Sequence, residues 1–451
     1  MNRYLILLNI YACCFIVSSC SSEWLDKKPD QKIAMITSID DLQALLDNHG
    51  VMNSNTPYMG ELSLPYYTIK EGELEQLSTP DRNTYMWKND LYEGYDPIVD
   101  WDWNYRKIFY ANVVLHELDR FPVDDVSKNT RSAALFFRAW ANYHLVQLFC
   151  QGFDRTTAHS VLGLPIKTTA DIHDIPQRSS LLETYQHIVD DLQESLYHHV
   201  DIQGSNLIRP NASAIRALLS KVFLLMGDYE KSLHQAEAII KNTNAALLDY
   251  KQLDETAKYP FSLFNNEVIF HASILPTNAM TVSRLLINQE FYDSYDDFDL
   301  RKKLFFRHEG DGTLRFKGSY CESDEYFSGI TLGEIYLIAA ECNVRIGKGD
   351  KGVEFLMDFL RKRYERVDQL QLRTDKLALL KAVIEERKKE LVLRGLGWGD
   401  LKRYNLEEDL AMPIVRSLSG QIIEMPANDN RYTMPIPEKV VKLSGLVQNI
   451  R

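Results

Sequence analysis

The sequence predicts a mainly α-helical protein, built as a scaffold of tetratricopeptide-like helix pairs that carries long irregular insertions and a few short strands. Two observations support this fold class. Apolar residues recur at the spacing of amphipathic helices over about residues 100–242 and 330–394. Residues 50–99 and 243–329 instead contain Pro, Gly, Asn and Tyr without sustained periodicity, which indicates two insertions. With 45% apolar residues, the chain can bury a real core.

The N-terminus has the features of an export signal. Arg3 supplies a positive charge, and the mostly apolar run 4–17 is too short to span a hydrocarbon core of ~30 Å. Residues 17–20 are similar to the lipobox of bacterial lipoproteins, in which Cys20 would become the acylated N-terminus. We therefore expect a signal peptide over 1–19, a lipidated tether over 20–32 and a single domain over 33–451. An ordinary secretory signal is the alternative.

The helices are expected mostly in pairs. A first helix at 38–48 has Ser38 as its N-cap. Apolar stripes then predict a hairpin of helices over about 100–118 and 130–150, joined at Phe121 and Pro122. A second pair follows at about 180–199 and 212–226.

Residues 217–240 are similar to a tetratricopeptide repeat. Gly227 precedes the turn between the two helices, Tyr229 packs into that turn, and Ala236 lies where the helices approach closely. A second match over 334–346 ends at Gly347 and leads to a helix over 350–366. A last helix is expected at 376–394, before an irregular tail over 405–451, and residues 267–271 are expected to form a strand. Such pairs stack into a scaffold because one pair alone cannot bury its apolar face.

Composition and motifs argue against several classes of function. A net charge of −12 argues against nucleic-acid binding. Outside the signal and Cys20, the remaining cysteines lack the spacing of a disulfide framework or a zinc site. No GxSxG, HExxH, P-loop or GxGxxG motif occurs, so we predict that the protein is not an enzyme and has no cofactor. The acidic run 293–299 lacks the glycine and the terminal glutamate of an EF-hand, so no metal site is predicted.

Ordered motifs along nearly the whole mature chain resemble the SusD/RagB family of outer-membrane nutrient-binding lipoproteins. Residues 24–29 look like the opening motif of the family, and residues 105–112 and 138–149 are similar to its first two repeat helices. Further motifs recur at family-like intervals at residues 163–166, 178, 185, 190–192, 209–211, 386–391, 398–403, 434–437 and 448–449. One motif departs from the pattern, because Arg394 stands where the family has an acid and Gly397 where it has a base. This exchange suggests a rearranged ion pair.

The resemblance implies a function and a location. Members of the family act as lids on a TonB-dependent transporter of the SusC type, and capture glycans or peptides for import. It therefore implies a lipoprotein that is anchored in the outer membrane, faces the cell exterior and binds a nutrient ligand, with a glycan as the expected ligand. Glu23 and Asp26 resemble the acidic surface-export signal of these lipoproteins, although a solvated tether would look the same.

Ligand residues are expected in the two insertions, because binding sites are often built on loops that a rigid scaffold holds. A sugar needs an aromatic face together with amide, guanidinium or carboxylate groups. We predict a ligand site that draws on Trp87, Tyr85, Arg82, Asn89, Tyr320 and Tyr326. Trp87 is the main candidate for a stacking platform, and packing in the core is its alternative.

Three alternatives remain open at this stage. The first is a peptide-binding lid like RagB, and the second is a structural helical-repeat lipoprotein of the envelope without a small ligand. The third is a glycoside hydrolase, which would need two carboxylates either about 5–5.5 Å or about 6.5–9.5 Å apart in a cleft.

Overall fold

The structure is a computed structural model that describes residues 36–201, 206–370, 375–418 and 420–451. The predicted signal peptide, Cys20 and the tether lie outside the described residues. Helices dominate, as predicted, and the strands are short. No helix in the described part of the chain is long and apolar enough to cross a membrane.

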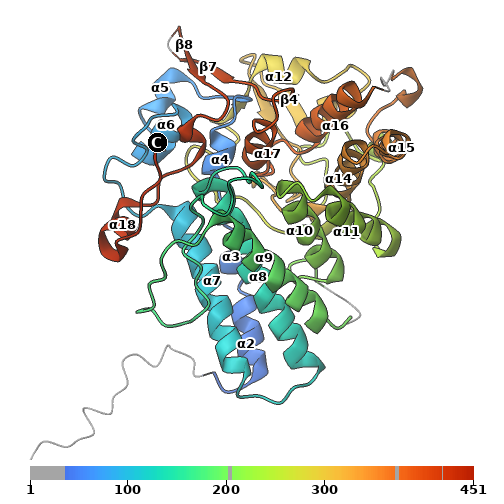
Figure 1. The fold of residues 1–451 in the computed structure, drawn as a ribbon. Helices are drawn as coiled ribbons and strands as arrows, with labels where there is room; N and C mark the ends of the chain where they lie inside the picture. The colour runs from blue at the N-terminus through green and yellow to red at the C-terminus, as the bar shows by residue number, and fades with distance from the viewer. Residues whose placement is uncertain (1–35, 202–205, 371–374, 419) are drawn as a thin grey trace, which may run out of the picture.

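The first group of helices packs side by side in the lower half of the molecule (Figure 1). It contains α2 (Ile39–Leu46), α7 (Val99–Leu118), α8 (Asp125–Phe149) and α9 (Leu181–His198). Ser38 and Ser180 form capping boxes at the starts of α2 and α9. The helix α8 begins earlier than the predicted residue 130, because Asp124 and Ser127 form a capping box there. The predicted hairpin of α7 and α8 is confirmed.

The second group curves along the right of Figure 1 and contains the tetratricopeptide-like pairs. These are α10 (Ala212–Leu225) with α11 (Tyr229–Asn242), and α14 (Leu332–Arg345) with α15 (Gly349–Leu360), followed by α16 (Lys376–Glu390). Gly227 and Gly347 lie in the two turns with φ angles of 68° and 81°, which glycine adopts without strain. Both predicted pairs are confirmed. However, α15 and α16 end before the predicted residues 366 and 394.

The two insertions are more ordered than the sequence predicts. The first contains α3 (His49–Met52), α4 (Met59–Leu62), β1 (Tyr67–Thr68), α5 (Glu71–Leu74) and α6 (Thr79–Tyr85). The second contains β2 (Val268–Phe270), β3 (Leu286–Ile287), α12 (Gln289–Asp293), α13 (Arg301–Phe305), β4 (Phe306–His308), β5 (Leu314–Phe316) and β6 (Ile330–Thr331). One sheet with the order β1-β3-β5-β4 joins the two insertions, and β2 pairs with β6. The strand expected at 267–271 is confirmed as β2.

The C-terminal tail is not irregular throughout, so this expectation is wrong. After α17 (Gly397–Tyr404) it forms a hairpin of β7 (Ile414–Leu418) and β8 (Gln421–Met425), and then α18 (Glu438–Ser444). The hairpin is ordered because one of its side chains is buried against the first insertion. Arg416 of β7 is buried and donates hydrogen bonds to the carbonyl groups of Tyr85, Leu62 and Leu64 in the first insertion.

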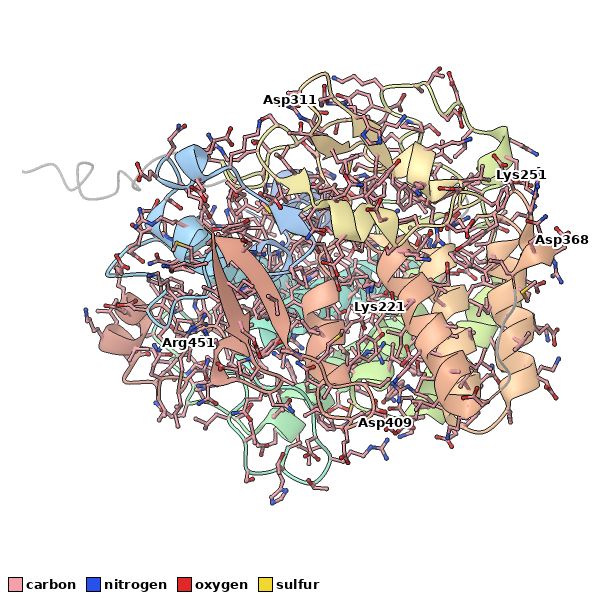
Figure 2. All side chains as sticks on the ribbon, turned by 90° about the horizontal axis from the view of Figure 1, so that it is seen from above. Lys221, Lys251, Asp311, Asp368, Asp409 and Arg451 are labelled. Carbon is pink, nitrogen blue, oxygen red and sulfur yellow. The ribbon has the colours of Figure 1, made fainter. Side chains whose placement is uncertain are left out.

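Several charged side chains are buried as ion pairs between these elements. Lys221 lies near the middle of the molecule in Figure 2, whereas Asp311 and Asp368 lie near its edge. The Nζ atom of Lys221 is 3.2 Å from Oε1 of Glu334, and both side chains are at most 2% exposed. Arg363 pairs in the same way with Glu267 and Glu390. Burial of an unpaired charge would be costly, so these pairs hold α10, α14, α16 and the second insertion in one arrangement.

The rearranged ion pair expected for Arg394 is not present among the described residues. The guanidinium group of Arg394 instead lies 4.0 Å from the ring centre of Tyr320 and 4.7 Å from that of Phe327. Its charge therefore meets the faces of two aromatic rings. Gly397 is explained by packing, because a Cβ atom there would lie 2.6 Å from Cδ1 of Leu64.

Candidate functional site

Trp87 does not present a ring face to solvent. Its side chain is 3% exposed, and its indole Nε1–H donates a 2.9 Å hydrogen bond to the carbonyl oxygen of Ser63. The guanidinium group of Arg416 lies 4.7 Å from its ring centre. Its burial matches the packing alternative, and a role of Trp87 in ligand binding stays a prediction.

Three other predicted aromatic residues are also buried. Tyr85 is 1% exposed, and its hydroxyl accepts a hydrogen bond from the backbone N–H of Ile69. Tyr320 is fully buried, with its hydroxyl 2.6 Å from that of Tyr250. Tyr326 is 3% exposed. Aromatic content in irregular segments therefore marks the core of the insertions here, because these rings fill the space between short elements.

The two polar residues of the predicted site lie nearer the surface. Arg82 is half-buried in α6, and Asn89 is exposed in the loop that follows. Asn89 lines a shallow, polar hollow together with Asn430, Arg431 and Arg451. The structure thus does not bring the six predicted residues together around one cavity.

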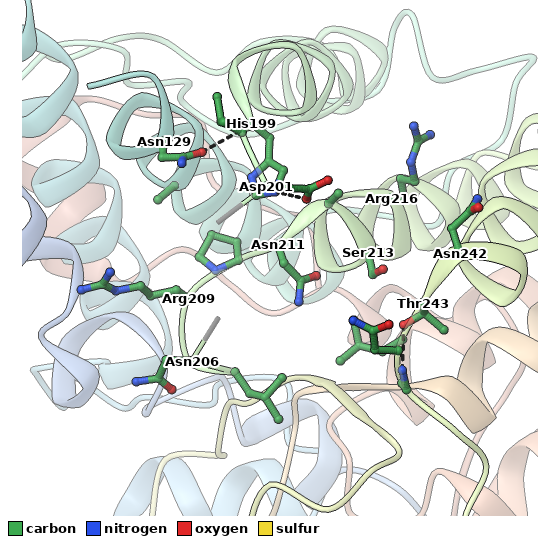
Figure 3. A pocket seen from close by; sticks show the side chains of 18 of the residues that line it. Asn129, His199, Asp201, Asn206, Arg209, Asn211, Ser213, Arg216, Asn242 and Thr243 are labelled. Atoms are coloured by element: carbon green, nitrogen blue, oxygen red, sulfur yellow. Dashed lines mark hydrogen bonds and ion pairs between the residues drawn. The ribbon is translucent and has the colours of Figure 1, made fainter. Parts of the chain in front are cut away.

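A deeper hollow lies in the helical scaffold (Figure 3). It has a volume of about 660 Å³, within the range of about 300–1,000 Å³ that is usual for small-molecule sites. Its described lining comes from α2, α8, the segments that follow α9 and precede α10, the ends of α10 and α11 that face each other, and β2. The polar residues of this lining include Asn129, His199, Asp201, Asn206, Arg209, Asn211, Ser213, Arg216, Asn242 and Thr243.

Three asparagines of the hollow are held in a fixed orientation by the backbone. The Oδ1 atoms of Asn129, Asn206 and Asn211 accept hydrogen bonds from backbone N–H groups, of Val200 at 2.7 Å, Ile208 at 3.2 Å and Ala214 at 2.9 Å. Asn211 is the N-cap of α10. Each of these hydrogen bonds fixes which end of the amide is the oxygen, and so fixes the direction in which its NH₂ group points.

The charged residues of the hollow differ in their ion-pair and hydrogen-bond partners. Arg209 binds Asp47 through two nitrogen–oxygen contacts of 2.8 and 2.5 Å. Nε2 of His199 lies 3.2 Å from Oδ1 of Asp201. Arg216 donates from Nη1 to Oε1 of Gln235 at 2.9 Å, and has no acidic partner among the described residues. Asp201 is the only carboxylate of the described lining, so the hollow lacks the pair that a glycoside hydrolase needs.

Sequence reasoning missed this hollow because its residues have ordinary structural roles when they are considered one at a time. An asparagine before a helix predicts an N-cap, and nothing in the sequence indicates that residues 129, 206, 211 and 242 lie around one cavity. The clustering of asparagine at the ends of predicted helices was the only available signal.

Comparisons with known proteins agree along most of the chain. A SusD-like family model described as "Starch-binding associating with outer membrane" matches residues 23–224, and the model of the SusD family matches residues 321–450. The chain is 23% identical over 414 residues to a SusD-like protein from Formosa agariphila, which covers 77% of this chain and 79% of that protein.

Solved structures share the fold over nearly the entire chain. A SusD superfamily protein from Bacteroides thetaiotaomicron matches with a TM-score of 0.76 at 22% identity, over 92% of this chain and all of that one. A SusD-like carbohydrate binding protein from Bacteroides vulgatus matches with a TM-score of 0.69 at 17% identity, over 90% of this chain and 96% of that one. At these identities the structural matches establish the fold.

Proposed function

The chain belongs to the SusD family, and from this premise we propose that it is a surface lipoprotein that binds a glycan and delivers it to a TonB-dependent transporter. In this proposal Cys20 carries the lipid that anchors the protein in the outer membrane, and the domain over 33–451 faces the cell exterior. The observation that carries the proposal is that family models match residues 23–224 and 321–450 and that the fold agrees over 92% of the chain. One matched family model is described by starch binding, and matched structures include SusD-like carbohydrate binding proteins.

The chemistry of the hollow supports ligand binding without catalysis. Oriented amide groups and a guanidinium group can hydrogen-bond the oxygens of a sugar, and one carboxylate alone supplies no acid–base pair. The buried aromatic residues of the insertions do not contribute a stacking face in this structure. We therefore place the glycan in the hollow of Figure 3 and leave the shallow surface around Asn89 as a secondary contact.

A direct binding experiment tests the proposal. The mature protein without its signal and tether would be screened against an array of glycans and peptides, and each hit would be measured by titration calorimetry and tested for hydrolysis. We expect glycan binding without cleavage. Binding of peptides alone would favour the peptide-binding lid, release of reducing ends would favour a hydrolase, and binding of neither class would favour a structural lipoprotein.

A further inference from the structure

We propose that a single water molecule is bound in a buried cavity between α8, α10, α16 and α17, where it bridges Arg387 to Tyr143 and Gln147. The cavity has a volume of about 10 Å³. A cavity of roughly 10–15 Å³ holds one water molecule if it offers two to four polar partners, and it excludes any larger ligand. The water joins the first group of helices, through α8, to the second group, through α16. This inference does not depend on the proposed function, because it concerns how the helical scaffold is held together.

The first argument is a buried donor without a protein acceptor. Arg387 of α16 is buried, its Nε donates to Oδ2 of Asp400 at 2.7 Å, and its Nη2 donates to Oε1 of Glu334 at 3.4 Å. The Nη1 atom of Arg387 has no hydrogen-bond partner among the described residues. A buried donor without an acceptor is costly, and a buried water commonly supplies the acceptor. Arg387 and Asp400 both line the cavity, so a water there can accept from Nη1.

The second argument is the wall that α8 contributes. Tyr143 and Gln147 are about one helical turn apart, so their side chains lie on the same face of α8, and both residues line the cavity. Nε2 of Gln147 donates to the hydroxyl of Tyr185 at 3.1 Å. Oε1 of Gln147 and the hydroxyl of Tyr143 form no hydrogen bond with another described residue. One water can therefore donate to both of these oxygens while it accepts from Arg387.

The third argument is that short distances join these groups around the cavity. Nζ of Lys221, near the middle of the molecule in Figure 2, lies 5.4 Å from the ring centre of Tyr143. The same Nζ lies 3.2 Å from the glutamate oxygen to which Arg387 donates. A Cβ atom at Gly399, the residue before the aspartate that binds Arg387, would collide with Oε1 of Gln147. The glycine therefore leaves room for this amide oxygen beside the cavity.

The charges around the cavity favour water over an ion. Asp400 and Oε1 of Gln147 would repel an anion, and Lys221 and Arg387 would repel a cation. These charges also neutralise one another, since Lys221 pairs with Glu334, and Arg387 pairs with Asp400 and Glu334. The ligand that fits is neutral, both donates and accepts hydrogen bonds, and is no larger than water.

Neighbouring cavities give water a route to this site. A second cavity of about 10 Å³ shares Gln147, Leu225 and Gly399 with the first. A more open hollow of about 340 Å³ shares Phe153, Leu225 and Arg403 with the second. Because the three spaces share walls, a water molecule passes only a few side chains on its way from the hollow to Arg387.

A crystal structure of the mature protein tests the site directly. We expect one peak of electron density in the cavity, about 2.7–3.2 Å from Nη1 of Arg387 and within hydrogen-bond distance of Tyr143 and Gln147. A second crystal, soaked in bromide, distinguishes an anion, because bromide gives an anomalous signal and water does not. A cavity without a density peak, or an anomalous peak inside it, would overturn the inference.

Two matched substitutions test whether the water contributes to stability. Tyr143→Phe deletes a hydroxyl that no described protein group uses, so the variant loses only the contact with the water. The equilibrium constant of unfolding, from urea curves, should rise roughly 2- to 12-fold, which corresponds to one net hydrogen bond. The control is Tyr326→Phe, because the Tyr326 hydroxyl is also buried without a protein partner but Tyr326 lines none of the three spaces. This control should leave the constant unchanged or lower it, and an equal effect of the two substitutions would overturn the bridge to Tyr143.

Discussion

At the scale of single residues, Trp87 shows how a large side chain in an irregular segment acquires a structural role. A cavity left by the loss of a buried aromatic ring is costly, so Trp87→Ala should destabilise the protein by roughly 3–5 kcal/mol. The ring also covers Arg416, which would lose one of its two aromatic neighbours. A urea unfolding curve would measure the loss, and calorimetry at a temperature where the variant is folded should give an unchanged affinity for ligand.

The half-buried Trp103 provides a matched control for this prediction. It packs against Arg106 at the surface of α7, with the guanidinium group 4.4 Å from its ring centre. Trp103→Ala should cost clearly less than Trp87→Ala. If Trp87→Ala melted at the wild-type temperature and lost ligand affinity, the original assignment of Trp87 as a binding platform would be restored.

Asp100 should make stability depend on pH. Burial raises the pKa of its carboxyl group from 3.8 to about 7, although it accepts hydrogen bonds from the backbone N–H groups of Tyr58 and Met59. The folded state therefore holds a proton that the unfolded state releases between about pH 4 and pH 7, so this group lowers the free energy of unfolding as pH rises through that window. In Asp100→Asn the decline should be smaller. Urea unfolding at several pH values would measure it, and parallel curves for the two proteins would show that Asp100 does not titrate in this range.

At the scale of elements, the contact between helices predicts the effect of overpacking. Ala236 of α11 is fully buried where α11 packs against α10 and α14. Ala236→Trp should therefore cost roughly 1–3 kcal/mol or more, because the ring cannot fit without moving a helix. Thermal unfolding would measure the change. Glu237→Trp, at the exposed neighbouring position, should leave the melting temperature nearly unchanged. Equal melting of both variants would mean that these helices do not pack as a repeat pair.

The elements that could be predicted from the sequence are those that are determined by residues close together in the chain. The helices α10, α11, α14 and α15 follow from apolar periodicity and from glycines that end each first helix. The sheet β1-β3-β5-β4 could not be predicted, because it pairs residue 67 with 287 and 287 with 314 through strands of two or three residues. The hairpin of β7 and β8 was missed for a similar reason, since the inward Arg416 finds its partners in the first insertion.

The hollow of Figure 3 could not be predicted from the sequence, for the same physical reason. Family-like motifs locate scaffold residues, whereas the hollow arises where segments far apart in the sequence, from α2 to β2, meet. The asparagines there serve as caps and loop anchors, and only the arrangement of the elements brings them around one hollow. The same arrangement buries the aromatic residues that were predicted to bind ligand.

At the scale of the whole molecule, the proposed lipid anchor and the family fold predict a membrane-bound partner. We expect the protein to co-purify with a large TonB-dependent β-barrel from native outer membrane in mild detergent, because a ligand captured outside the cell must still cross that membrane. Cys20→Ala supplies the control that separates anchoring from partner binding. It should abolish acylation and move the protein to the aqueous phase in detergent extraction, while the purified variant should still capture the transporter from solubilised membranes. A variant that stays membrane-bound and acyl-labelled would contradict the lipoprotein assignment. A pull-down in which neither form recovers a transporter would contradict delivery to a barrel, and would leave a binding protein that acts on its own at the cell surface.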